Sequence, residues 1–226
     1  MSNKPKICLV MPVRDEASVI ERCLASVKDH IDHWLIADTG STDDTIDRIE
    51  NVLGEVPGEL IQLPWTDFAS VRNELRERSR GLADYVLWLD ADETLEMIGE
   101  PFASLVGPGY GLEVRTSRGA FVQWRLARDD AMYCYAGPVA EALVGPRKIP
   151  CLDEVSITHH EDGVRWHDVA KNQRDILLLK GALLEAPQNP SLLLALADCH
   201  AARGELAEAL HYYQARADMK GPEAQT

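Results

Sequence analysis

The sequence predicts an α/β fold with a mostly parallel central sheet, followed by a short helical extension. Apolar runs alternate with helical patterns through the first 93 residues, and parallel neighbouring strands need such crossover helices. From residue 164 onward the pattern is helical. With 226 residues, 46% of them apolar and 27% charged, the chain has an ordinary globular composition and room for one domain with a small appendage.

The first half is expected to consist of strand and helix pairs. Residues 6–11 form a continuous apolar run closed by Pro12, which is typical of a strand buried on both faces, and a helical pattern follows at 16–28. Gly54 ends the helical pattern of residues 46–53. The remaining strands of this half are expected at 33–37, 59–63 and 85–89, and the remaining helices at 46–53 and 67–80.

The second half is punctuated by Gly and Pro and predicts strands at 111–116, 120–128 and 149–158. We therefore expect a first domain at 1–163 and a helical tail at 164–226. Within the tail, residues 190–218 have the spacing of one tetratricopeptide repeat. A single helical hairpin cannot bury both of its faces, so the leucine-rich run at 192–196 suggests a homodimer surface.

The net charge of −14 argues against electrostatic binding to nucleic acid, which needs clustered Lys and Arg. No window approaches the length of a membrane span, and the N-terminal apolar run is too short for a signal peptide, so a cytoplasmic protein is expected. The five cysteines lack zinc-type spacing and are expected to be buried thiols.

Polar clusters follow three of the predicted parallel strands, at residues 12–16, 38–43 and 90–93. Ligands bind beyond the carboxyl ends of such strands, so the clusters are expected to line one crevice. Asp90 and Asp92 are two residues apart, which in extended chain places both carboxylates on one side, where they could share Mn²⁺ or Mg²⁺. A cation with open coordination positions suits a diphosphate.

Four ordered motifs, MPVRDE, IADTGSTDDT, WTDFASVRNEL and YVLWLDADE, resemble the N-terminal half of the family 2 glycosyltransferases of GT-A fold. The similarity is greatest to the branch with tetratricopeptide tails, which includes lipopolysaccharide-core and peptide glycosyltransferases. It is strong over residues 6–95 and looser beyond them. The resemblance implies a GT-A domain that binds a nucleotide-sugar, with a UDP-sugar as the expected donor and a divalent metal as cofactor.

The resemblance also implies residue roles. Asp38 would read the base, Arg72 would lie near the sugar-diphosphate, and Asp92 would hold the metal and serve catalysis. Contacts to the nucleotide-sugar are expected at Pro12, Arg14, Glu16, Asp38, Arg72, Asp90, Ala91 and Asp92, and metal contacts at Asp90, Asp92 and His159. His159 and His160 are neighbours on a strand and point to opposite faces, and the family similarity favours His159 as the inward one.

The implied reaction is transfer of a sugar to an acceptor with inversion at the anomeric carbon. Glu141 is the candidate base, because YAGPVAEAL resembles a family segment that carries His-Glu, although Ala140 stands where the histidine would be. A surface carboxylate on a short helix is the alternative role of Glu141.

Two other functions stay open. One is a non-catalytic interaction protein built on GT-A and tetratricopeptide elements, and the other is a phosphohydrolase, because residues 87–94 also fit a DxDxT nucleophile motif. The acceptor is undetermined among a glycan, a lipid-linked glycan and a peptide.

Overall fold

The computed structural model describes residues 4–139, 142–145, 148–163 and 170–219. Contacts divide the chain into two compact units. The first consists of Met1–Thr66, Val71–Cys134 and Leu143–His167, and the second of Asp67–Ser70, Tyr135–Ala142 and Asp168–Thr226. The second unit therefore includes two short segments from the expected first domain, residues 67–70 and 135–142. The expected division at residue 163 stays a prediction.

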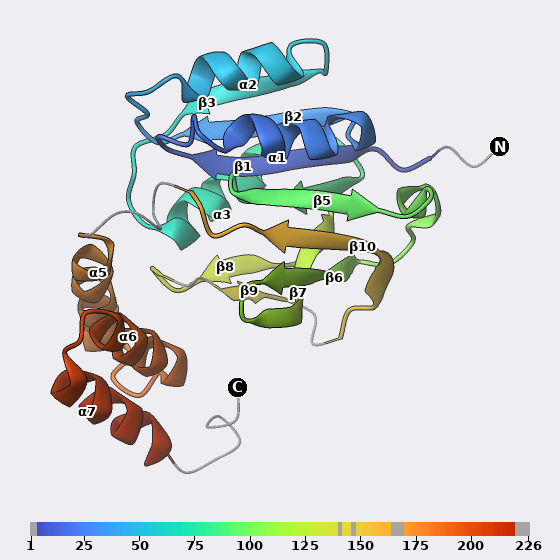
Figure 1. Cartoon of the computed structure of the whole chain (residues 1–226). Helices are drawn as coiled ribbons and strands as arrows, with labels where there is room; N and C mark the ends of the chain where they lie inside the picture. The colour runs from blue at the N-terminus through green and yellow to red at the C-terminus, as the bar shows by residue number, and fades with distance from the viewer. Residues whose placement is uncertain (1–3, 140–141, 146–147, 164–169, 220–226) are drawn as a thin grey trace. The chain divides into compact units, whose positions relative to one another are not determined.

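The first unit is built on an eight-stranded sheet of order β3-β2-β1-β4-β7-β6-β10-β5, which confirms the α/β class (Figure 1). The pairings among β1, β2, β3 and β4 are all parallel, whereas β7 and β5 run against their neighbours. The strands are β1 (Ile7–Val13), β2 (His33–Asp38), β3 (Gly58–Gln62), β4 (Tyr85–Trp88), β5 (Glu93–Met97), β6 (Gly109–Thr116), β7 (Gly119–Arg128) and β10 (Cys151–His159).

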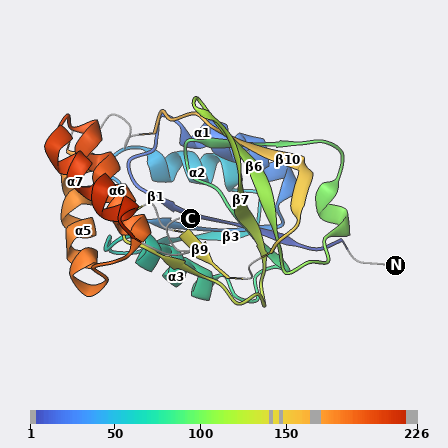
Figure 2. The same cartoon turned by 90° about the horizontal axis from the view of Figure 1, so that it is seen from below.

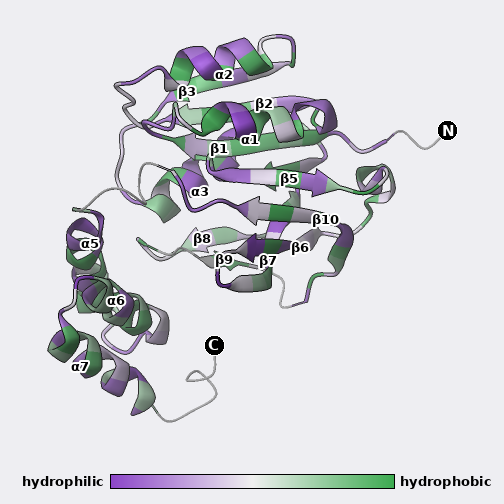
Figure 3. Cartoon of the chain, viewed as in Figure 1, coloured by the Kyte–Doolittle hydropathy of each residue, from purple (hydrophilic) through white to green (hydrophobic). Residues whose placement is uncertain are grey.

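Helices cover both faces of this sheet. Figures 1 and 2 place α1 (Ile20–Val27) and α2 (Thr45–Leu53) over one face and α3 (Phe68–Arg78) over the other. The covering helices are amphipathic, and Figure 3 shows apolar and polar segments alternating along α1 and α2. Their buried side chains, including Leu24 and Leu53, join the core formed by β1, β2 and β4. Short 3₁₀ turns occur at Lys28–His30 and Pro101–Ser104.

Several of the sequence expectations need correction. Of the five cysteines expected to be buried, Cys8 and Cys23 are buried, whereas Cys134 and Cys151 are exposed and Cys199 is partly buried. The first helix begins at Ile20 rather than at residue 16, because the backbone of residues 15–17 is hydrogen-bonded to the loop after β2 instead. Strand β5 was not expected, nor was the small second sheet of β8 (Cys134–Ala136) and β9 (Ala142–Val144). The other predicted strands and helices are present, with ends that differ by a few residues.

The second unit contains α5 (Lys171–Glu185), α6 (Pro190–Ala202) and α7 (Leu206–Ala217). Asn189 caps α6 by accepting hydrogen bonds from the Ser191 and Leu192 amides, and Gly204, with φ 74°, makes the turn before α7. Leu179 and Leu196 are fully buried in the core of this unit. In the described part of the chain, no helix is long and apolar enough to cross a membrane.

Gly58 of β3 lies against the indole of Trp34, its partner on β2. A Cβ at residue 58 would stand 2.3 Å from the ring, which is 6% exposed and donates to the Val56 carbonyl over 2.8 Å. We expect Gly58→Ala to lower the free energy of unfolding by about 1–3 kcal/mol, because the ring must shift. Urea unfolding measures the change.

Gly181→Ala is the matched control for this substitution. Nothing lies within 4 Å of a Cβ at residue 181, which is inside α5. Alanine there is expected to raise the free energy of unfolding by about 0.5–1 kcal/mol, because glycine costs backbone entropy in a helix. A Gly58→Ala variant as stable as the parent protein would contradict the proposed fit of Trp34 against β3.

Candidate functional site

The three polar clusters meet at the carboxyl ends of adjacent strands. β1 pairs in parallel with both β2 and β4, so the segments that leave these strands emerge side by side. The segment 12–16 follows β1, 38–43 follows β2, and 90–93 follows β4. The sheet therefore brings together residues that are up to about eighty positions apart in the sequence.

The loops after β1 and β2 are joined by hydrogen bonds. The Asp15 amide donates to Ser41 Oγ over 2.9 Å, and Asp15 Oδ1 accepts from the Thr42 amide over 2.6 Å. The Glu16 amide donates to Thr45 Oγ1 over 2.8 Å. Asp15 adopts a φ of 53°, in the left-handed region that disfavours side chains larger than glycine. These hydrogen bonds hold the loops after β1 and β2 against each other.

Asp38 ends β2 and is 1% exposed. Its carboxylate accepts from the Ser41 amide at 3.0 and 3.2 Å and from the Gly40 amide at 3.2 Å. Gly40 has a φ of 107°, a conformation that favours glycine. Asp38 thus shapes the loop after β2, and its expected role in reading a nucleotide base stays a prediction.

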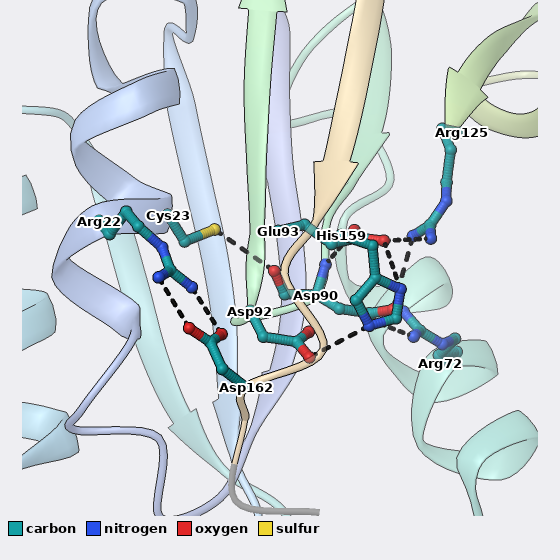
Figure 4. A network of polar contacts seen from close by, with 9 residues as sticks. All are labelled: Arg22, Cys23, Arg72, Asp90, Asp92, Glu93, Arg125, His159 and Asp162. Carbon is teal, nitrogen blue, oxygen red and sulfur yellow. Dashed lines mark hydrogen bonds and ion pairs between the residues drawn. The ribbon is translucent and has the colours of Figure 1, made fainter. Parts of the chain in front are cut away.

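Asp90 lies between two arginines (Figure 4). Oδ1 is 2.5 Å from Arg72 Nη2 on α3, and Oδ2 is 3.7 Å from Arg125 Nη1 on β7. Burial opposes ionisation of this carboxyl group, but the two guanidinium charges outweigh it and hold the pKa of Asp90 well below its usual range. Arg72 is 5% exposed and also lies over the Trp88 ring at 5.7 Å. The structure thus directs Arg72 inward, as expected from the sequence.

Glu93 is a functional-site residue that the sequence analysis counted only as part of an acidic turn. Its side chain is fully buried, with Oε1 2.6 Å from Arg125 Nη2 and Oε2 accepting from the Asp90 amide over 2.8 Å. Burial is the main reason that the pKa of Glu93 is raised to about 7; the negative charge of Asp90 adds to this and Arg125 opposes it. Glu93 and Arg125 therefore connect the turn after β4 to β7 through a buried ion pair.

Arg125 was also missed, although a signal for it existed. It is an arginine within the largely apolar end of β7, at the bulge where Trp124 pairs with Gly111 and Leu126 with Tyr110, so Arg125 is the extra residue on this strand. Arg76 is a further correction, because only Arg72 of the charged helix was expected to point inward. Arg76 is 9% exposed, lies over the Tyr133 ring at 4.6 Å and donates to the Ala131 carbonyl.

Asp92 and His159 form the pair with the chemistry of a cation site. Asp92 Oδ2 lies 3.1 Å from His159 Nε2, and the hydrogen bond that the Asp92 carboxylate accepts raises the pKa of His159. Within the described ranges, no three His, Cys, Asp or Glu side chains are grouped to hold a metal ion. The Asp92 carboxylate nevertheless suits Mg²⁺ or Mn²⁺, which is held by one or two protein carboxylates and completes its shell with water and substrate phosphates, whereas an imidazole is a less usual ligand for these two ions. Asp90, whose oxygens face Arg72 and Arg125, stays only a predicted ligand.

The segment after β10 returns to Asp92. A Cβ at Gly163 would stand 3.1 Å from Glu16 Oε2 and 3.2 Å from Asp92 Oδ2, so glycine permits this close approach. Asp162 is bound to Arg22 of α1 through two hydrogen bonds of 2.7 and 2.8 Å, which Figure 4 shows. The Arg22–Asp162 pair thus holds the segment after β10 beside Glu16 and Asp92.

The remaining predicted residues are placed as follows. His160 is exposed and its Nε2 lies 2.9 Å from Thr94 Oγ1, so His159 and His160 diverge as strand geometry requires. Arg14 is exposed, Pro12 is partly buried near the end of β1, and Ala91 is 5% exposed between the two aspartates. The candidate base Glu141, with its neighbour Ala140, lies outside the described residues.

Residues 8–97 match the family model described as glycosyl transferase family 2. The matched stretch contains the three loops at the strand ends and the aspartates of the turn after β4. It ends before Arg125 and His159, so the match says nothing about these two residues.

Among curated proteins, the chain is 42% identical over 91 residues to a TPR repeat-containing protein of Synechococcus elongatus and 34% identical over 92 residues to the SPbeta prophage-derived glycosyltransferase SunS of Bacillus subtilis. Each alignment covers 40% of this chain and 21% of the relative. The chain thus spans about a fifth of the length of these relatives.

Two solved structures are similar at low sequence identity. S. aureus TarS in complex with UDP is 16% identical, with a TM-score of 0.43, over 94% of this chain and 87% of that one. Glucosyl-3-phosphoglycerate synthase from Mycobacterium tuberculosis, in complex with Mn²⁺, UDP and glucosyl-3-phosphoglycerate, is 19% identical, with a TM-score of 0.35, over 50% of this chain and 43% of that one.

Proposed function

We propose that the protein is a glycosyltransferase that moves a sugar from a nucleoside-diphosphate sugar, with UDP-sugar as the expected donor, to an acceptor hydroxyl or other nucleophile. The observation that carries the proposal is the meeting of Asp92, His159, Arg72 and Arg125 at the carboxyl ends of β1, β2 and β4. Arg72 and Asp92 belong to the stretch, residues 8–97, that matches a glycosyltransferase family model.

The charges suit a diphosphate. The chain carries a net charge of −14, so an anionic donor needs local positive charge. Asp92 and His159 would hold a divalent cation, which stabilises negative charge on the departing diphosphate when bound. Arg72 is held inward by Asp90 and adds a guanidinium group nearby. The joined loops after β1 and β2, with Asp38 at their base, would enclose the nucleoside.

The reaction we propose inverts the anomeric carbon. The acceptor oxygen forms a bond to this carbon while the bond to the diphosphate oxygen breaks, and the diphosphate leaves with the electron pair. A carboxylate takes the acceptor proton. Glu141 is the proposed base.

Glu141→Gln tests that assignment. The amide cannot accept the acceptor proton at neutral pH, so we expect donor-induced thermal stabilisation to be retained and the transfer rate to fall by about 10²–10⁴-fold. Unchanged transfer would remove Glu141 from the mechanism.

A screen of nucleotide-sugars by thermal shift, with Mn²⁺ present and absent, tests the proposed function. Stabilisation that requires both the nucleotide and the cation, followed by release of the nucleotide during incubation, is the expected result. Stabilisation by UDP with Mn²⁺ but no turnover of any nucleotide-sugar would favour the non-catalytic interaction protein. Hydrolysis of simple phosphomonoesters would favour the phosphohydrolase.

The structure gives a reason to rank the phosphohydrolase below the transferase. That function requires Asp90 to act as a free nucleophile, whereas Asp90 Oδ1 is held by Arg72 at 2.5 Å. The tail as a binding module, a homodimer and a cytoplasmic location stay predictions.

A further inference from the structure

A cavity of about 390 Å³ lies between the β6–β7 turn and the end of β10. Its lining includes Thr116, Arg118, Ala120 and Phe121 from the hairpin and His159 and Glu161 from the end of β10. The volume is in the range of small-ligand sites, which is about 300–1,000 Å³. No residue predicted from the sequence to bind the donor lines it, apart from His159.

The cavity adjoins the proposed donor site through His159. The imidazole of His159 lines the cavity, and its Nε2 is 3.1 Å from Asp92 Oδ2. Strand register places Phe121 opposite Val114, and Val114 opposite Ile157, so Phe121 and Ile157 share a sheet face. His159 lies two residues beyond Ile157 on that same face. Figure 2 shows β6, β7 and β10 next to one another.

The hairpin turn is held in a defined shape. Thr116 Oγ1 donates to the Gly119 carbonyl and accepts from the Arg118 amide, both at 3.1 Å. Gly119 has a φ of 138°, which only glycine adopts readily. Arg118 and Phe121 are therefore presented from a preorganised turn, and binding there costs little conformational entropy.

Two charged side chains of the cavity, Arg118 and Glu161, are available to a ligand. Among the residues the structure describes, no ion-pair partner faces Arg118 or Glu161. Arg115, on the same hairpin, differs because it pairs with Glu96 and Glu113. Phe121 is 51% exposed, so an aromatic ring stands open to solvent beside an unpaired guanidinium and an unpaired carboxylate.

We propose that this cavity is the acceptor subsite and that it takes a sugar residue of a neutral glycan. The inference rests on the proposed glycosyltransferase function. The C–H face of a sugar ring packs on an aromatic ring, while its hydroxyls bond to carboxylate and guanidinium groups. Arg118 and Glu161 carry opposite charges that cancel, so the cavity offers no net attraction to a phosphorylated or acidic acceptor.

Saturation-transfer NMR on the full chain with UDP and Mg²⁺ tests the proposal. The probes are the methyl glycosides of glucose, galactose, mannose and N-acetylglucosamine, with inorganic phosphate and a neutral hexapeptide as competitors. At least one glycoside should receive saturation from the protein. Phe121→Ala and Arg118→Ala should each weaken its binding about five- to tenfold, because each removes one main contact.

Val122→Ala and Arg115→Ala are the matched controls. Val122 is 59% exposed next to Phe121 but on the other face of β7, and Arg115 is on the same hairpin without lining the cavity. Both controls should bind the glycoside as the parent protein does. Equal loss in a control and in Phe121→Ala would mean that the hairpin is merely disturbed, and would overturn the proposal.

The outcomes separate this proposal from the proposed function. If UDP and Mg²⁺ stabilise the protein but no glycoside binds, or binding survives in both cavity variants, the acceptor subsite is wrong and the donor site stands. If the peptide binds instead and loses affinity in Phe121→Ala, the cavity has a different acceptor. If UDP gives no stabilisation with any divalent cation, the proposed function itself fails.

Discussion

Asp92→Ala is expected to abolish both the cation-dependent stabilisation by UDP and sugar transfer. Asp92 and His159 are the described pair with cation-ligand chemistry, and loss of the carboxylate leaves a single imidazole. Stabilisation of transition-state charge by a metal is worth several kcal/mol and each 1.4 kcal/mol is about tenfold in rate, so turnover should fall by at least about a hundredfold. Thermal shift with UDP and Mn²⁺, and release of UDP from the donor, measure the two effects.

Glu100→Ala is the control for Asp92→Ala. Glu100 is a carboxylate whose side chain is 76% exposed, and it pairs only with Lys4 at 3.3 Å among the described contacts. This variant should keep both the thermal shift and turnover. The assignment of the cation to Asp92 is wrong if Asp92→Ala retains the UDP and Mn²⁺ shift after correction for its own melting temperature without ligand.

Arg125→Met is expected to have the largest effect on stability. Arg125 and Glu93 form an ion pair whose side chains are 8% and 0% exposed. Removing one member of a buried pair costs about 3–5 kcal/mol, because Glu93 must then either stay buried as an uncompensated charge or take up a proton. In a chain of this length the melting temperature should fall by about 10 °C. Thermal and urea unfolding in EDTA measure the loss.

The loss in the free energy of unfolding caused by Arg125→Met should increase with pH. Burial raises the pKa of Glu93 to about 7 in the folded protein, above its ordinary value of 4.5, so Glu93 itself lowers stability as pH rises between these values. Without Arg125 the folded pKa rises further. The difference in stability between parent and variant should then grow by about 1.4 kcal/mol per pH unit above pH 7.

Glu93→Gln supplies the test of this mechanism. With a neutral side chain at residue 93, Arg125→Met should cost less and its cost should no longer depend on pH. If Arg125→Met lowers the free energy of unfolding equally at every pH in the protein that retains Glu93, Arg125 stabilises the fold through packing rather than through the buried pair.

β1, β2 and β4 could be predicted because they are nearly continuous apolar runs. These three strands are buried on both faces, so each is a run of apolar residues that can be recognised without knowing which strands it pairs with. β5 could not be found in this way. Its five residues, ETLEM, are mixed in character, and it pairs with β10, about sixty residues later, rather than with a neighbour in sequence.

The site could be predicted in part for a related reason. Asp38, Asp90 and Asp92 follow apolar strands, so their position was readable from the sequence. Arg72 and His159 were predicted only through the family resemblance, and Arg125 was missed, because these three side chains arrive from α3, β10 and β7 through the sheet order. Glu93 directly follows Asp92 in the acidic turn, yet it is the residue that is fully buried.

The most direct test of the account is calorimetric titration of UDP into the full chain, with Mn²⁺ and again with EDTA. The proposed site predicts saturable binding with the cation and binding at least about tenfold weaker without it, since each 1.4 kcal/mol of affinity is about tenfold. The absence of UDP binding under both conditions, in protein that unfolds cooperatively, would contradict the account.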